Sequence, residues 1–289
     1  MAISRRQFLL GMGLGTSMLL LPSLRGVRAS TDATSSPRLS TTISRGRSDL
    51  PQVCLTYDDL WDEDIALEMA QAFADHDMRV TFFPIGSAIT ANIDRPKPGY
   101  ADLYKQIYDM GHEFGCHLYT HTDITEADVY RLRWWEVQPW LDEMERALGF
   151  PYEPVAIRPP MGIVTQALHL IAQEYELPIV MWSADTRDSF CTVDYCEDLL
   201  LSYFVGELKN GAIFLQHTIP ASAVIIDAQV EALEEAGMEN VLLSDMLAAL
   251  FDEDYDPDAT VDETDAGTDS DAASDDEDAD STPEPRSFG

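Results

Sequence analysis

Short apolar runs alternate with amphipathic stretches between residues 51 and 251. Between the runs, apolar positions recur every three or four residues, as in Ile65, Met69 and Phe73, and this spacing predicts helices. Strands separated by helices form a parallel sheet that is covered on both faces. Seven strands are predicted, at 52–57, 79–85, 113–117, 154–158, 178–182, 212–216 and 240–243. Seven such units without a break in composition predict one α/β domain that resembles a barrel, with an open doubly wound sheet as the alternative.

Different patterns flank this domain. Arg5 and Arg6 precede an apolar run at 9–21 that ends near Ala29, which is typical of a cleaved twin-arginine export signal at 1–29. Residues 30–50 are rich in Ser, Thr and Arg and predict a flexible linker. Residues 252–289 are too acidic and too polar to order themselves. We therefore expect a periplasmic or extracellular protein that is not held in a membrane once its signal is cleaved.

Acidic residues dominate the charge of the chain. The sequence has 52 Asp and Glu against 18 Lys and Arg, which gives a net charge of −34. Residues 252–289 hold 16 acidic residues and one basic residue, yet residues 51–251 still carry 34 acidic and 10 basic residues, a net charge of −24. Binding to a nucleic-acid backbone needs a basic surface, so this class of function is excluded.

The four cysteines follow no zinc-binding spacing. Cys191 and Cys196 could form a disulfide in an oxidising compartment. Alternatively, all four residues, including Cys54 and Cys116 within apolar runs, are buried thiols.

Most residues capable of metal or proton chemistry follow the ends of predicted strands. They are Asp58 and Asp59 after the first strand, His117 and His121 at the third, Arg158 at the fourth, Asp185 and Asp188 after the fifth, and His217 after the sixth. His76, His112 and His169 lie within helical patterns or at a helix end, and we expect no chemistry from them. Because the carboxyl ends of the strands in a parallel barrel converge on one face, the first group should form a single site.

These residue types point to a hydrolytic metal site. Asp59, His117 and His121 offer one carboxylate and two imidazoles, a set that holds a divalent ion and leaves positions open. Asp58 is then free to take a proton from water, and Arg158 can neutralise the adjacent carboxylates. His217 can donate a proton to a leaving group.

The chain resembles the polysaccharide deacetylase family, the nodulation-type deacetylases of carbohydrate esterase family 4. Five motifs carry the resemblance, in family order: Thr56-Tyr57-Asp58-Asp59, the stretch 111–121 with its two metal histidines, Arg158-Pro159-Pro160-Met161-Gly162, the stretch 182–188, and Leu215-Gln216-His217. The resemblance covers residues 52–250.

The resemblance implies a distorted (β/α)7 barrel and hydrolysis of N- or O-acetyl groups on a glycan, such as peptidoglycan, a chitin-like oligomer, xylan or an exopolysaccharide. The implied cofactor is zinc or another divalent ion, with cobalt, nickel and manganese as alternatives. The implied roles are Asp58 as base, His217 as acid, Asp59, His117 and His121 as metal ligands, Arg158 and Asp188 as partners of Asp58 and His217, and the Met161 amide as oxyanion donor.

Several positions depart from the family pattern. Leu60 replaces a usual Gly and is followed by Trp61, a bulky pair that could narrow the substrate groove. Leu118 replaces a Ser or Thr whose hydroxyl would steady the metal loop. Met161, Ser189 and Thr218 stand where an aromatic residue, Trp and Asp are common. The residues expected to contact substrate are Met161, Leu60, Trp61, Tyr119 and Leu215.

Two other functions remain open. A hydrolase of the same family could act on a small amide or a cyclic imide, as the crowding by Leu60 and Trp61 suggests. A non-catalytic glycan-binding protein is the other alternative. Trp134, Trp135 and Trp140 could form a sugar platform, although their spacing within a predicted helix favours packing.

Overall fold

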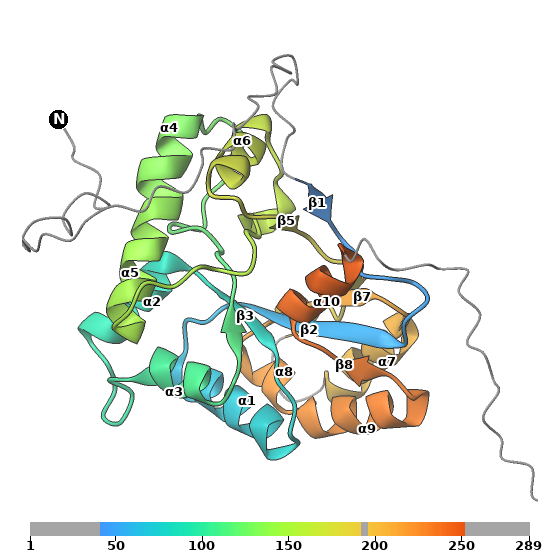
Figure 1. Cartoon of the computed structure of the whole chain (residues 1–289). Helices are drawn as coiled ribbons and strands as arrows, with labels where there is room; N and C mark the ends of the chain where they lie inside the picture. Colours follow the sequence, from blue (N-terminus) through green and yellow to red (C-terminus); the bar gives the residue numbers. More distant parts are fainter. Residues whose placement is uncertain (1–40, 192–195, 252–289) are drawn as a thin grey trace, which may run out of the picture. The chain divides into compact units, whose positions relative to one another are not determined.

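Parallel strands run through the centre of the computed structural model, and helices surround them (Figure 1). The structure describes residues 41–191 and 196–251, all of which belong to one compact unit. The expected export signal at 1–29 and the acidic tail at 252–289 lie outside the described residues. None of the described helices is long and apolar enough to cross a bilayer.

Five strands form the main sheet in the order β4-β3-β2-β7-β6, and β8 joins it beside the start of β2. β1 and β5 pair separately, and all of these pairs are parallel. The central strand β2 is buried on both faces, which explains the apolar residues Val53, Cys54 and Leu55 in its first half. The strands are β1 Thr42–Ile43, β2 Gln52–Asp59, β3 Thr81–Pro84, β4 Glu113–Phe114, β5 Ile179–Val180, β6 Ala184–Asp185, β7 Ala212–His217 and β8 Glu239–Asn240.

An extended segment connects the two sheets. Ile157 forms parallel bridges to Cys116 on one side and to Ile179 on the other. The predicted strand at 154–158 is therefore present only as these isolated bridges, and no continuous closed barrel forms among the described residues. The predicted α/β class is confirmed. The strands are parallel, but within the described ranges only isolated bridges link the two sheets. The predicted strand at 240–243 is wrong in its second half, because Leu243 begins a helix.

Helices pack in series around the strands, with α7 against α9, α9 against α1, α1 against α3, and α3 against α5. Gly111 follows α3 with a φ of 93°, in the left-handed region that favours Gly after a helix. The helices are α1 Glu63–Asp75, α2 Gly86–Asp94, α3 Leu103–Asp109, α4 Val129–Arg131, the π-helix η2 Leu132–Val137, α5 Gln138–Leu148, η3 Pro160–Gly162, α6 Gln166–Glu174, η4 Asp188–Phe190, α7 Glu197–Glu207, α8 Pro220–Ala223, α9 Ile226–Ala236 and α10 Leu243–Leu250.

The expected flexible linker at 30–50 is wrong in its described part. Thr42 and Ile43 form β1 and pair with Ile179 and Val180 of β5. Ile43 is buried in a cluster with Val180 and side chains of α10, so the burial of one β-branched residue fixes this segment to the domain. A strand of two residues is too short for the sequence pattern to reveal.

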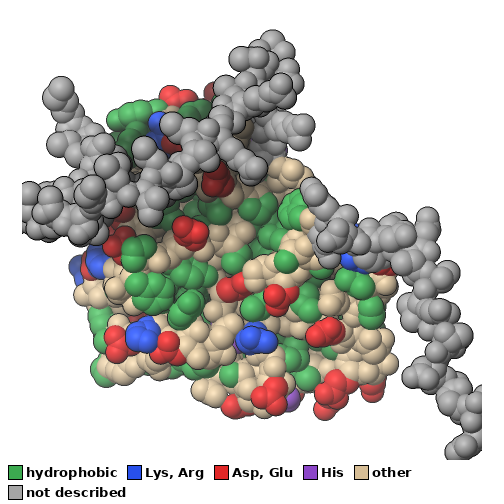
Figure 2. All heavy atoms as spheres, in the orientation of Figure 1, with side chains coloured by type: hydrophobic (Ala, Val, Ile, Leu, Met, Phe, Trp, Pro, Cys, Tyr) green, Lys and Arg blue, Asp and Glu red, His purple; other side chains and the backbone are tan. Residues whose placement is uncertain are grey.

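Two of the four cysteines are joined in a disulfide and the other two are buried thiols, so each of the two predicted alternatives holds for one pair. Cys191 and Cys196 form a disulfide, whereas Cys54 and Cys116 are buried free thiols. Burial raises the pKa of both free thiols, which keeps them protonated and unreactive. Acidic side chains are more frequent than Lys and Arg on the face shown in Figure 2, in keeping with the net charge of the domain.

Candidate active site

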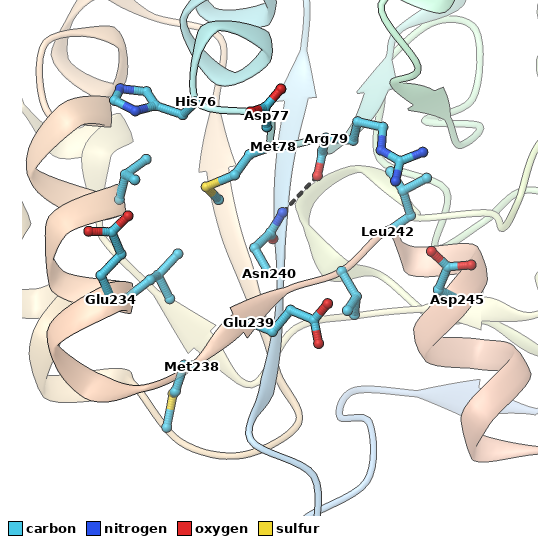
Figure 3. Close-up of a pocket in the computed structure, with 13 residues that line it drawn as sticks. His76, Asp77, Met78, Arg79, Glu234, Met238, Glu239, Asn240, Leu242 and Asp245 are labelled. Atoms are coloured by element: carbon cyan, nitrogen blue, oxygen red, sulfur yellow. Dashed lines mark hydrogen bonds between the residues drawn. The ribbon is translucent and has the colours of Figure 1, made fainter.

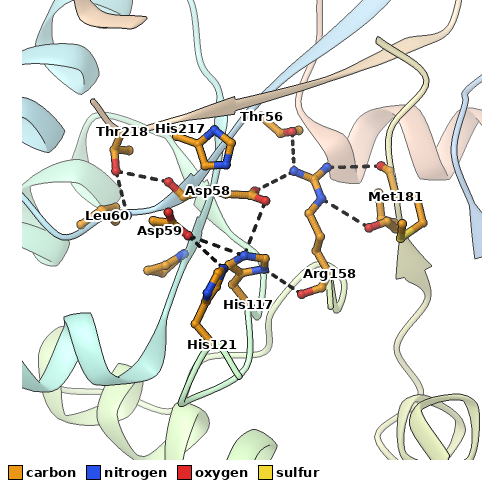
Figure 4. A network of polar contacts seen from close by, with 12 residues as sticks. Thr56, Asp58, Asp59, Leu60, His117, His121, Arg158, Met181, His217 and Thr218 are labelled. Atoms are coloured by element: carbon orange, nitrogen blue, oxygen red, sulfur yellow. Dashed lines mark hydrogen bonds and ion pairs between the residues drawn. The ribbon is translucent and has the colours of Figure 1, made fainter. Parts of the chain in front are cut away.

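The last two residues of β2, Asp58 and Asp59, lie at the centre of the site (Figure 4). Asp58 is in register with His217 at the end of β7, so the parallel pairing brings these two residues together. After β2 the chain turns sharply, with φ angles of 80° at Asp59 and 61° at Leu60. Such angles are strained for residues other than Gly and are often found at functional sites.

Asp59, His117 and His121 form a candidate metal site. Their ligand atoms all lie within 4.8 Å of one another. The Asp59 Oδ1 atom lies 3.7 Å from Nε2 of His117 and 3.6 Å from Nε2 of His121. This oxygen is buried and has no hydrogen-bond partner in the described structure, although a buried polar atom is costly to leave unpaired. One carboxylate and two imidazoles around this atom suit a divalent ion.

His117 is held in the form that a metal ligand needs. Its Nδ1 atom lies 2.8 Å from the main-chain carbonyl oxygen of Arg158, which fixes the N–H on Nδ1 and leaves the lone pair of Nε2 facing Asp59. Burial lowers the pKa of His117, while the nearby charges of Asp58 and Asp59 act in the opposite direction. The net direction favours the neutral ring.

Arg158 fixes Asp58, as the sequence predicted. Its Nη1 atom donates to Oδ1 of Asp58 at 2.7 Å and to Oγ1 of Thr56 at 2.7 Å. The guanidinium is fully buried, lies 4.1 Å from the centre of the Phe83 ring, and donates to the carbonyl oxygens of β5 residue Val180 and of Met181. A buried carboxylate beside such a cation has one well-defined orientation.

His217 and Asp188 form a second polar pair. Oδ1 of Asp188 lies 2.8 Å from Nδ1 of His217, and Oδ2 accepts the main-chain N–H of His217 at 2.6 Å. Ser222 and the amide of Ser189 also donate to this carboxylate, at 2.5 and 2.8 Å. Desolvation lowers the pKa of His217, but the hydrogen bond to Asp188, supported by the charges of Asp188, Asp58 and Asp59, outweighs it and raises the pKa to about 9. His217 is therefore a protonated acid at neutral pH.

The expected substrate contacts divide into exposed and buried residues. Trp61 is 51% exposed and Met161 is 57% exposed, so both can contact a ligand. Met161 has a φ of 56°, which turns the chain sharply after Pro160. Leu215 is only 8% exposed and lies two residues before His217, on the same face of β7, so it can offer a ligand only a small apolar surface.

The expectation that Leu60 narrows the groove is wrong. Leu60 is fully buried, because its positive φ turns the side chain into the core. Its amide donates to Oγ1 of Thr218 at 2.7 Å, and Asn92 donates to its carbonyl. Tyr119 is half-buried, with its ring against Gly86 and its hydroxyl 3.1 Å from Thr90, so it mainly packs on α2.

The sequence analysis missed several supporting residues. Thr56 links Arg158 to β7 through a hydrogen bond to the carbonyl of Phe214. Thr218 joins the carbonyl of Asp58 to the amide of Leu60. Glu136 binds the loop between the two metal histidines. The position of Thr56 and Thr218 next to the motifs is a usable signal, whereas Glu136 gives none.

The three tryptophans of η2 and α5 differ in how far they are exposed. Trp140 is fully buried and its indole N–H donates to the carbonyl of Pro84 at 2.7 Å, as expected for packing. Trp134 and Trp135 are exposed, so the packing expectation is wrong for both. His112 has a structural role, because one ring nitrogen lies 3.0 Å from the amide nitrogen of Val80 and the other lies 3.0 Å from the carbonyl oxygen of Ala70.

A separate cavity of about 320 Å³ lies near the start of β2, beside β8 (Figure 3). Asn240 crosses it and donates to the carbonyl oxygen of Arg79 at 2.7 Å. None of the strand-end residues lines this cavity. The candidate active site therefore lies at the opposite ends of the strands.

The fold and the site define an α/β protein with a candidate metal site beside a buried aspartate, Asp58, and with His217 in register with that aspartate. Residues 45–180 match the family model for polysaccharide deacetylase. Residues 45–180 therefore contain a polysaccharide deacetylase domain, as the five sequence motifs predicted.

Curated relatives agree with this assignment. PgdA of Listeria monocytogenes, a peptidoglycan-N-acetylglucosamine deacetylase, is 27% identical over 199 residues, which cover 68% of this chain and 38% of the relative. The chitooligosaccharide deacetylase of Sinorhizobium fredii is 28% identical over 180 residues, which cover 61% of this chain and 76% of the relative. The chain spans 57% and 38% of the first two relatives that it matches.

Solved structures share the fold. A mutant of a Bacillus anthracis CE4 family pseudoenzyme, with restored enzymatic activity, has a TM-score of 0.64 and 26% identity, and the match covers 74% of this chain and 73% of that chain. A T48 deacetylase with substrate has a TM-score of 0.58 and 28% identity, and covers 68% of this chain and 90% of that chain. The similarity includes pseudoenzymes, so any activity has to be argued from the residues of this chain.

Proposed function

We propose that the protein is an exported, metal-dependent deacetylase that removes N- or O-acetyl groups from a glycan. The observation that carries the proposal is the position of Asp58 and His217, in register on neighbouring strands and each fixed by its own buried partner. A proton acceptor and a proton donor thus flank one candidate metal site. The names of the relatives support an N-acetylglucosamine polymer as the first substrate to test.

Each residue has a separate task in this reaction. Asp59, His117 and His121 would hold the ion, for which zinc is our first choice and cobalt, nickel or manganese are alternatives. The ion would polarise the acyl oxygen and acidify a water. Asp58, oriented by Arg158, accepts the proton of the attacking water. The Met161 amide donates to the developing oxyanion, an interaction that commonly stabilises by about 3 to 4 kcal/mol.

Breaking the acyl bond needs a proton on the leaving group. His217 donates this proton from Nε2 to the departing amine or alkoxide, while Asp188 holds Nδ1–H. Leu215 provides an apolar surface below His217 that suits the acetyl methyl group. The exposed Trp61 and Met161 can line the path of the sugar chain. A neutral glycan also suits the acidic domain better than a polyanion does.

Acetate release from peptidoglycan, chitin-like oligomers, acetylated xylan and exopolysaccharide tests the proposal, with and without a chelator. We expect release from at least one polymer, loss of release on chelation, and recovery when the ion is restored. No release from any glycan by the metal-loaded protein would overturn the function. Release from small amides or cyclic imides alone would select the same-fold amidase, an alternative that the burial of Leu60 now weakens. Glycan binding without turnover would select the non-catalytic alternative.

We further propose export by the twin-arginine route to the periplasm or the extracellular space, with cleavage after the signal at 1–29. The disulfide between Cys191 and Cys196 supports an oxidising destination. Replacement of Arg5 and Arg6 by Lys, followed by fractionation of cells, tests this proposal. Export that is unchanged in the double variant would refute it.

A further inference from the structure

The loop between the two metal histidines is held in a strained conformation. Leu118 and His121 have φ angles of 58° and 52°, in the left-handed region that favours Gly. Each such residue typically costs on the order of 1–3 kcal/mol and persists only where surrounding contacts enforce it. The backbone of this loop sets the direction in which His121 faces Asp59, so these contacts bear directly on the metal site.

The beginning of α2 holds one side of the loop. The amide of Gly86 donates to the carbonyl of Leu118 at 2.8 Å, and the amide of Ser87 donates to the carbonyl of Tyr119 at 2.9 Å. Gly86 also lies directly against Tyr119, where a Cβ atom would be only 2.4 Å from the ring. These contacts leave the N–H groups on the other side of the loop in need of an acceptor.

Glu136 provides that acceptor. Its Oε2 atom accepts the amides of Tyr119 at 3.1 Å and Thr120 at 2.9 Å, and its Oε1 atom accepts the hydroxyl of Thr120 at 2.6 Å. The residue is only 1% exposed. A buried carboxylate is costly unless hydrogen bonds stabilise it, and all three donors found here belong to the metal loop.

The helical segment around Glu136 is unusual as well. Residues Leu132–Val137 form a π-helix between the α-helical residues on either side. Helices of this kind are rare and often occur at functional sites. Within this segment Leu132 and Val137 are buried together with Glu136, so the wider turn places the carboxylate in the core between two apolar anchors.

We propose that Glu136 is a positioning residue for the metal ion, which acts by holding the 118–121 loop so that His121 faces Asp59. It acts on the loop from a separate helical segment, η2, which lies later in the chain. The inference rests on the proposed metal-dependent function, and it adds to that function a supporting residue outside the five motifs.

The affinity of the full-length protein for Zn²⁺, measured by competition with a chromophoric chelator, tests this role. We expect Glu136→Ala to weaken binding by about 10- to 100-fold, the usual effect of losing a residue that orients a metal ligand. Glu136→Gln should retain most of the affinity, because its amide oxygen can accept both amides and its NH2 group can donate to Thr120. The absorption of bound Co²⁺ should change in the Ala variant and not in the Gln variant.

Glu113→Ala is the matched control. Glu113 is also buried and accepts Oγ1 of Thr81 at 2.7 Å and the amide of Ser244 at 3.0 Å, but it contacts no residue of the metal loop. This variant should lower the melting temperature without changing the Zn²⁺ affinity.

Equal Zn²⁺ affinities for the wild type, Glu136→Ala and Glu136→Gln would overturn the inference. The inference would also be overturned if Glu113→Ala lost Zn²⁺ affinity in proportion to its loss of stability. Metal binding would then depend on the overall stability of the fold and not on the 118–121 loop. If Glu136→Ala does not fold, Thr120→Val decides, because it removes one of the three hydrogen bonds to Glu136. A Zn²⁺ affinity of Thr120→Val equal to that of the wild type would also overturn the role. Tight Zn²⁺ binding by the wild type without acetate release would instead refute the deacetylase function and leave the positioning role standing.

Discussion

Asp188 holds His217 twice, through the ring Nδ1 atom at 2.8 Å and through the main-chain N–H at 2.6 Å. One carboxylate therefore fixes both the backbone at the end of β7 and the orientation of the ring. The same carboxylate raises the pKa of His217 to about 9 despite the opposing effect of burial.

The pH dependence of Asp188→Asn follows from this pair. In the proposed reaction His217 acts as an acid, so activity should fall as the pH rises through about 9 and the ring loses its proton. An asparagine removes the charge that raises the pKa, so this fall should move to lower pH. The activity near pH 8 should drop by roughly 10²-fold or more, since a positioned general acid contributes about 10²- to 10⁴-fold.

Profiles of kcat/KM against pH measure this shift. Asp227→Asn is the control, because Asp227 is exposed and contacts only His76 among the ion pairs of the described structure. An alkaline limit that stays in place in Asp188→Asn would contradict the acid role. The free energy of unfolding should also fall as the pH rises. Protonated His217 contributes its full stabilisation below the pKa that the residue has in the unfolded chain, and this contribution is lost as the pH rises through about 9.

Asp58→Asn should retain the metal and lose turnover. Asp58 contacts Arg158 and lies 3.6 Å from His117, but it is not part of the three-residue metal cluster. Loss of the proton acceptor should reduce kcat by about 10²- to 10⁴-fold. Metal content by elemental analysis, together with acetate release, checks both parts. A variant that stays fully active would show that another group takes the proton.

His121→Ala should lose metal affinity without losing the fold. His121 lies at the edge of the site and is only half-buried, so its removal deletes a ligand and little packing. His112→Ala is the opposite case, since it leaves the buried amide of Val80 without its acceptor and should destabilise by about 1–3 kcal/mol while metal binding persists. Chemical denaturation and Zn²⁺ titration of both variants separate the two effects. Equal metal affinity in the two variants would argue against the assigned ligand.

Arg158→Met should be strongly destabilising. The change leaves Asp58 buried without its cation and also breaks the contact with Thr56, and loss of one partner of a buried ion pair typically costs about 3–5 kcal/mol. Urea denaturation measures this cost. The double variant Asp58→Asn, Arg158→Met should recover part of the stability, because the uncompensated charge is then absent. No recovery in the double variant would mean that lost packing, and not charge, explains the effect.

The sequence predicted most of the reactive centre for a simple physical reason. Parallel strands bring their carboxyl ends to one edge, so Asp58, His117 and His217 could be placed together without knowledge of any contact. The same argument placed Arg158 and Asp188 at this edge, whereas the pairing of Asp188 with His217 was implied by the family resemblance. Their hydrogen bonds, at 2.7 and 2.8 Å, have the length expected where a carboxylate accepts from a cationic group.

The remainder depended on backbone geometry that a pattern of residues does not contain. Leu60 was expected at the surface, and only its positive φ explains its burial. Glu136 looks like any acidic residue of a solvated helix, because its burial arises from the π-helical turn and from loop residues that lie 16 and 17 positions earlier in the chain. Ile43 was hidden in a polar stretch and is ordered by a single buried side chain.

The redox state of the four cysteines reports whether a molecule of this protein has reached an oxidising compartment. Two thiols are shielded by the core and the other two are joined, so the oxidised chain offers nothing to a thiol-specific reagent until it is reduced or unfolded. A molecule retained in a reducing compartment would instead expose the pair beside η4. Alkylation of the native protein, followed by mass spectrometry, can therefore distinguish molecules that have reached an oxidising environment from those that have not.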